Sequence, residues 1–150
     1  MLFRSPLDGR LFALDIPEAQ GGKDAPALPA LHTCHTLYDY YGLTAHRTIE
    51  HQGHTLIITD EWRGPRQLVA AAWNFTVAPD ITVEQQGDEW VLGYQGRVLV
   101  TVSSPQLMFT DDAGWCSTQY GEKKPCRQLK ARHAMSTESP VEIVLRGAGE

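Results

Sequence analysis

The sequence predicts an all-β domain, an antiparallel two-sheet β-sandwich with about ten strands. Glycine and proline recur at intervals of about eight to twelve residues, the spacing of turns between short strands. Apolar residues alternate with polar ones in several segments, and no long segment repeats them at helical spacing. The links between segments are too short for crossovers, so antiparallel pairing is expected.

Alternation assigns an inward face to three segments. The residues expected inward are Val69, Ala71, Trp73, Phe75 and Val77 in the first, Val98, Val100 and Val102 in the second, and Val141, Ile143 and Leu145 in the third. Leu56, Ile57 and Ile58 are apolar on both faces. They therefore indicate a central strand that is covered on both sides.

The chain divides into a short N-terminal part and one domain. Residues 1–30 are expected to form a strand and a linker rich in Pro, Gly and Ala, and residues 31–150 the sandwich. Turns are predicted at residues 52–53, 87–88 and 95–96. The segments expected to be extended are 10–16, 32–41, 43–52, 54–62, 66–77, 81–86, 89–94, 97–103, 106–111, 115–121, 126–135 and 140–147.

Length and charge limit the class of protein. A chain of 150 residues can bury one real core, and a net charge of -5 argues against a nucleic-acid partner. No apolar run is long enough to span a bilayer, and Arg4, Asp8 and Arg10 interrupt any signal-peptide core. The sequence therefore does not decide the cellular compartment. An export signal on a preceding segment would predict the periplasm.

Three cysteines, Cys34, Cys116 and Cys126, cannot all pair within the chain. The two alternatives are three reduced, mostly buried thiols and a single bridge between Cys116 and Cys126 on neighbouring strands.

The stretch His32-Thr33-Cys34-His35 contains soft zinc ligands. In an extended strand, however, the two histidines face opposite sides. The alternative is a polar edge strand, and no metal ligand is assigned.

A second group of histidines, His46, His51 and His54, lies near Glu50 and Asp60. A histidine beside a carboxylate can act as a general base. No nucleophile accompanies this group, so solvent-facing cross-strand pairs are the other interpretation. The common catalytic signatures are absent from the sequence, and no catalytic residue is assigned.

Exposed aromatic rings can stack on sugars, and clustered cations can bind uronate or sulfate groups. The basic residues gather between residues 120 and 133. The alternatives are packing at the edge of the core for the aromatic residues, and a solvated strand face for the cations. The candidate substrate-binding residues are Trp62, Trp115, Tyr120, Lys123, Lys124, Lys130 and Arg132.

Three runs of sequence, in order, suggest a family. They are YYGLTAHRTIEHQGHTLIITDEWRG, WNFTVAPDITVEQQGDEWVLGYQGRVLVTV and WCSTQYGEKKPCRQLKARHAMSTESPVEIVLRG. Together they resemble the C-terminal β-domain of bacterial heparinase II/III-like proteins, over roughly residues 38–147.

The resemblance implies a supersandwich-like domain attached behind an α/α toroid. Full-length relatives are polysaccharide lyases that cleave uronic-acid polymers by β-elimination, with zinc ligands in a His-x-His segment. This chain lacks the toroid and that segment, so no catalytic residue, zinc ligand or cofactor is carried over. The expected partners are the absent toroid and, for the candidate residues above, an acidic polysaccharide.

The resulting prediction is a non-catalytic C-terminal module that supports a lyase and is inactive alone. One alternative is a stand-alone carbohydrate-binding or protein-interaction sandwich, in which no large exposed apolar patch is expected. Another is a small metal-dependent barrel enzyme using His32, His35 and His46.

Overall fold

The computed structural model describes residues 30–35, 42–65, 67–117, 121–137 and 139–148. The expected strand at 10–16 and the linker lie outside these residues. Within them the chain forms ten strands and no helix, so no helix long and apolar enough to cross a membrane is found there. The strands are β1 (Leu31–His35), β2 (Thr44–Gln52), β3 (Thr55–Arg63), β4 (Leu68–Val77), β5 (Thr82–Gln86), β6 (Glu89–Tyr94), β7 (Arg97–Ser103), β8 (Thr110–Cys116), β9 (Lys124–Ser136) and β10 (Val141–Gly147).

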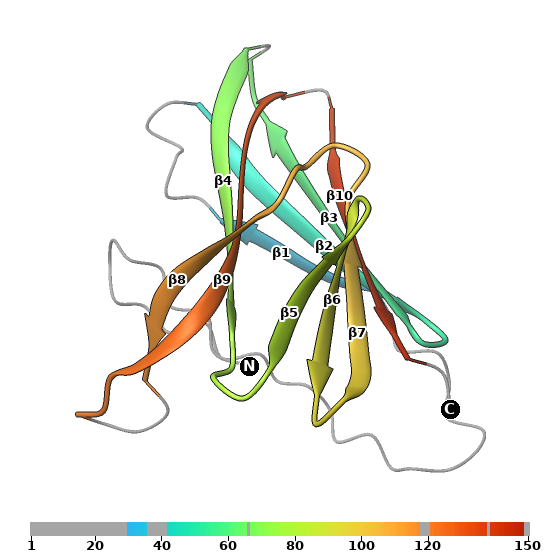
Figure 1. Cartoon of the computed structure of the whole chain (residues 1–150). Helices are drawn as coiled ribbons and strands as arrows, with labels where there is room; N and C mark the ends of the chain where they lie inside the picture. Colours follow the sequence, from blue (N-terminus) through green and yellow to red (C-terminus); the bar gives the residue numbers. More distant parts are fainter. Residues whose placement is uncertain (1–29, 36–41, 66, 118–120, 138, 149–150) are drawn as a thin grey trace.

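Two antiparallel sheets contain all ten strands, which confirms the predicted sandwich (Figure 1). The seven-stranded sheet has the order β1-β2-β3-β10-β7-β6-β5, and the three-stranded sheet the order β4-β9-β8. The β8–β9 hairpin reaches away from the large sheet at the lower left of Figure 1. This hairpin carries five of the 13 Lys and Arg residues of the chain, which are Lys123, Lys124, Arg127, Lys130 and Arg132.

The core lies between the two sheets. Leu129 of β9 and Ile143 of β10 are both 0% exposed, and Phe75 meets Phe109 edge to face with ring centroids 5.9 Å apart. The predicted inward face of β4 is confirmed, since its odd-numbered residues are buried or half-buried and its even-numbered ones are exposed. Burial of these apolar side chains is the main force holding the sheets together.

The turns predicted at residues 87–88 and 95–96 form as expected, whereas the one predicted at residues 52–53 lies one residue later, at residues 53–54. Gly53, Gly87 and Gly96 all have positive φ, as hairpin turns of two residues require. Gly64, which directly follows β3, has φ of 146°, and a Cβ there would overlap the backbone oxygen of Gly42. The Gly-Pro stop after β3 therefore reflects a close approach of two backbones that only glycine permits.

The alternation predicted for Val98, Val100 and Val102 breaks at Val98. Trp90 pairs with Val102, but the register shifts between Leu92 and Gly93, so that β7 has one extra residue. Val102 is buried, whereas Val98 is 49% exposed. The cause is this β-bulge, because an extra residue reverses the face of every side chain beyond it.

Two separate extended segments, 106–111 and 115–121, were expected where the structure has the single strand β8. The Ser104 hydroxyl accepts hydrogen bonds from the backbone N–H groups of Gln106 and Leu107, at 3.3 and 3.2 Å, and donates one to the carbonyl of Glu142. This arrangement turns the chain and buries Leu107 before β8 begins. A serine-centred turn competes with the strand ladder, which the apolar pattern does not reveal.

The interior position predicted for the doubly apolar strand is confirmed, because β3 lies between β2 and β10. Ile58 is buried opposite Ile143. Ile57 is only half-buried on the other face, opposite Val144. The expectation that both faces are fully covered is therefore wrong for this strand within the described residues.

Candidate functional site

The β8–β9 hairpin brings three of the candidate binding residues together at the end where the two strands are connected. Trp115 lies opposite Pro125, and its side chain is 57% exposed. The Lys123 Nζ lies 4.5 Å from the centroid of the Trp115 ring, a cation–π contact. Lys124 begins β9 directly opposite Cys116. We call Trp115, Lys123 and Lys124 the hairpin tip; the remaining candidate there, Tyr120, lies outside the described residues.

Most of the positive charge along β9 is neutralised within the hairpin. Arg127 forms a two-point ion pair with Asp111, whose first contact is 2.7 Å from Nε to Oδ1. Lys130 Nζ lies 3.3 Å from Asp112. The hydrogen bond with Asp111 raises the pKa of Arg127, with the charge of Asp111 adding to it.

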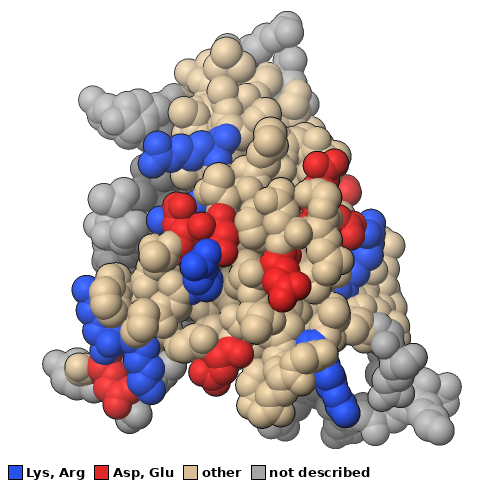
Figure 2. All heavy atoms as spheres, in the orientation of Figure 1, with Lys and Arg blue, Asp and Glu red and all other residues tan. Residues whose placement is uncertain are grey.

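The tip contains one further ion pair, between Lys124 Nζ and Glu122 at 3.1 Å. Figure 2 shows acidic and basic side chains intermixed over this side of the molecule rather than one continuous basic face. Exposed ion pairs of this kind contribute little to stability. Their effect is to reduce the long-range attraction of β9 for a polyanion.

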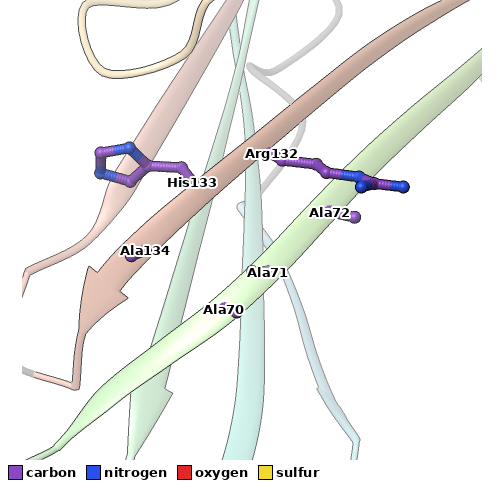
Figure 3. Close-up of a pocket in the computed structure, with 6 residues that line it drawn as sticks. All are labelled: Ala70, Ala71, Ala72, Arg132, His133 and Ala134. Atoms are coloured by element: carbon purple, nitrogen blue, oxygen red, sulfur yellow. The ribbon is translucent and has the colours of Figure 1, made fainter.

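Arg132 lies further along β9, away from the tip, and makes no ion pair within the described part of the chain. It borders a shallow depression of about 490 Å³ with His133 and a floor of alanines from β4 and β9. Figure 3 shows Arg132 and His133 pointing to opposite sides of the strand. Their cationic and imidazole groups do not converge, so the depression has no paired groups for acid–base chemistry.

Trp62, the last candidate, belongs to the other sheet. It stands opposite Ala45 near the end of β3 and packs against the core cluster. The structure therefore does not gather all the predicted binding residues into one site. It unites Trp115, Lys123 and Lys124, and it separates Trp62, Lys130 and Arg132 from them.

The expected group of histidines and carboxylates is divided between faces. His46 stands opposite Glu61, and Glu50 opposite Ile57, on the outer face of the large sheet. Asp60 points to the inner face instead. His51 and His54 flank the turn at the far end of the hairpin and are exposed. Asp60 is therefore not a partner of the histidines. His46 lies on the opposite face of the sheet, and His51 stands opposite Leu56, four residues along β3 from Asp60.

Asp60 instead joins the two sheets. Its carboxylate accepts hydrogen bonds from Arg47 Nε and Nη2, both at 2.6 Å, and from the indole Nε1 of Trp73 at 2.7 Å. The β2–β3 turn lies at residues 53–54 and places Arg47 opposite Asp60, whereas the turn expected at residues 52–53 would have placed Arg47 opposite Ile58. The contact with Trp73 depends on how the sheets pack and has no local signal.

The described side chains of the first histidine stretch lie beside residues of β2. His32 Nδ1 lies 3.0 Å from the Thr48 hydroxyl, and Cys34 stands opposite His46. In the parts of the chain that the structure describes, no three His, Cys, Asp or Glu side chains are placed to hold a metal ion. The side chain of His35 is outside those parts.

Several solved structures have a similar fold. The heparan sulfate lyase HepC from Pedobacter heparinus superposes with a TM-score of 0.62 at 11% identity, over 80% of this chain and 20% of that enzyme. Two structures of a heparinase III gene product, one with methylated lysines, give TM-scores of 0.60 and 0.58 at 15% identity. They are covered over 19% and 18% of their length, and they cover 81% and 77% of this chain.

This chain has the fold of a β-domain found in heparinase-type polysaccharide lyases, as the sequence resemblance predicted. It spans about a fifth of the length of those enzymes. No protein-family model and no curated protein matches the sequence.

Proposed function

We propose that this chain is the non-catalytic, C-terminal β-sandwich module of a heparinase II/III-like polysaccharide lyase that acts on uronic-acid polymers by β-elimination. The observation that carries the proposal is the size of the structural match. Most of this chain corresponds to about a fifth of each lyase, the proportion expected of one module beside a larger catalytic domain. In that enzyme the sandwich supports the catalytic domain.

The side chains of the described residues support a non-catalytic role. β-Elimination needs a base beside the proton α to the carboxylate and an acid at the leaving oxygen. The described histidines that could serve lie on the outer face of β2 or at the exposed β2–β3 turn. No second acid–base group converges with them around a hollow in the described part of the chain.

The hairpin tip supports a contact with the polymer. One face of the Trp115 ring is covered by Lys123, and the ring is more than half exposed. A sugar ring stacked on the free area of the indole would bring its carboxylate or sulfate within reach of Lys123 and Lys124. The two lysines are mobile point charges, which suits a polymer with variable anionic groups.

We expect Trp115→Ala to weaken binding of a heparan sulfate oligosaccharide about fivefold, equivalent to ~1 kcal/mol for loss of one aromatic contact. The matched control is Tyr94→Ala, which removes an exposed aromatic ring at the β6–β7 turn instead. Isothermal titration measures both affinities, and chemical-shift perturbation locates the contact. Equal affinities for the two variants, or chemical-shift changes that miss the hairpin tip, would contradict a contact between the tip and the polymer.

A stand-alone carbohydrate-binding domain is the second candidate, and one observation favours it. The exposed large apolar side chains occur at the start of β4, the β6–β7 turn, the segment before β8 and the hairpin tip. They are Leu68, Tyr94, Val98, Leu99, Met108 and Trp115. Within the described residues this scatter gives no single broad patch on which a catalytic domain would dock.

A further inference from the structure

Two cysteines lie on the same face of the three-stranded sheet. Cys116 ends β8 opposite Lys124, and Cys126 lies in β9 opposite Gly114. Residues two apart on a strand share a face, so the two cysteines are diagonal neighbours on adjacent strands. Cys34 belongs to β1 of the other sheet. The register thus selects one pair from the three thiols.

The two thiols are close as well as on one face. Burial raises the pKa of the Cys126 thiol, and the charge of Cys116 and a hydrogen bond with its side chain raise it further. Both of these effects act only between side chains that lie near each other, which agrees with the register of β8 and β9. Diagonal neighbours have Cα atoms about 7–8 Å apart, slightly more than the roughly 4.4–6.8 Å that most disulfides span. A small closing movement of the two strands would be sufficient.

The position opposite Cys126 helps that movement. Gly114 has no side chain of its own between the two cysteines, although the side chain of Gln128 packs over its Cα. The two thiols also differ in access, because Cys116 is half-buried whereas Cys126 is only 6% exposed. An external oxidant would therefore reach Cys116 first.

We propose that Cys116 and Cys126 form a reversible disulfide that clamps the end of the β8–β9 hairpin. The proposal is independent of the proposed function. With a small disulfide such as oxidised glutathione as oxidant, the Cys116 thiolate attacks one sulfur and releases one glutathione thiolate. The Cys126 thiolate then attacks the Cys116 sulfur of the mixed disulfide and releases the second. The protein loses two protons and two electrons, and glutathione disulfide is reduced to two thiols.

The clamp closes a short loop that contains the hairpin tip residues Lys123 and Lys124, and it adjoins Trp115. Closing a loop removes conformations from the unfolded chain, so the folded, oxidised protein gains stability. By thermodynamic linkage, the equilibrium constant for forming the bridge is larger in the folded chain than in the unfolded chain. The factor is the same as that by which the bridge increases the equilibrium constant for folding.

The test uses the full chain in glutathione buffers of graded oxidised-to-reduced ratio, followed by alkylation of free thiols and peptide mass spectrometry without reduction. We expect a linked Cys116–Cys126 peptide pair, two hydrogen atoms lighter than the separate peptides, with Cys34 alkylated. The equilibrium constant for the bridge should be at least about tenfold larger in the folded chain than in urea. Dithiothreitol should reverse it.

Cysteine variants distinguish the Cys116–Cys126 disulfide from other oxidation products. Oxidation should raise the melting temperature of the parent chain and of Cys34→Ser by several degrees, but not that of Cys116→Ser, which changes the half-buried partner. Accumulation of mixed disulfides on Cys116 without closure would overturn the proposal. So would an equal bridge constant in folded and unfolded chains, or a linkage through Cys34.

Discussion

Replacing Ile143 with alanine is expected to lower the free energy of unfolding by about 4 kcal/mol, within the range measured for large-to-small changes in cores. Ile143 is fully buried in β10, the middle strand of the seven-stranded sheet, and it pairs with Ile58. Removing three carbons there loses burial and leaves a cavity between two sheets that cannot close independently. Urea unfolding followed by tryptophan fluorescence measures the change.

The matched control is Val144→Ala, one residue further along the same strand. Val144 faces outward, opposite Ile57 and Ser103, and is half-buried. Its loss is expected to cost about 1 kcal/mol or less. Similar costs for both variants would contradict the assignment of inner and outer faces, because that assignment requires one face of β10 to carry the core.

Replacing Asp60 with alanine is expected to cost about 3 kcal/mol, because it leaves a half-buried guanidinium and an indole N–H without their acceptor. The Asp60 side chain is 14% exposed and that of Arg47 33%, so water reaches the pair only in part. Asp60→Asn should cost less, since an amide oxygen can still accept from Trp73. Thermal and urea unfolding of both variants measure the difference.

Asp88→Ala provides the control for a lost aspartate. Asp88 lies exposed at the β5–β6 turn, and its replacement is expected to change stability by less than about 0.5 kcal/mol. If Asp60→Ala cost no more than this control, the carboxylate would not be joining the sheets. The hydrogen bond between Asp60 and Trp73 would then contribute nothing measurable to the free energy of unfolding.

The fold was predictable where local chemistry decides it. Alternation in β4 and β10 assigned the correct inward faces, and the turns at residues 87–88 and 95–96 were predicted correctly. The β2–β3 turn was predicted one residue too early. The bulge beside Leu92 and the turn around Ser104 escaped prediction, because one extra residue or one hydroxyl changes the ladder without changing the apolar pattern. The order of strands in the sheets depends on contacts that no local segment encodes.

The candidate site was predictable only in part. Residue type and position near a strand end identified Trp115 and Lys123, which the structure stacks together. Sequence alone could not show that Arg127 and Lys130 are neutralised from β8, because their acidic partners depend on the register of that hairpin. Nor could it separate Asp60 from the histidines, since faces follow from register rather than from proximity in the chain.

The proposal that this sandwich is one module of a larger lyase is tested most directly by the size of the natural polypeptide. An antibody raised against residues 31–150 would be used to probe an extract of the source organism. A lyase-sized band, about five times the length of this chain, is the result expected from the 20% coverage of HepC. A single band matching 150 residues would contradict the proposal, and it would make a stand-alone carbohydrate-binding domain the function to pursue.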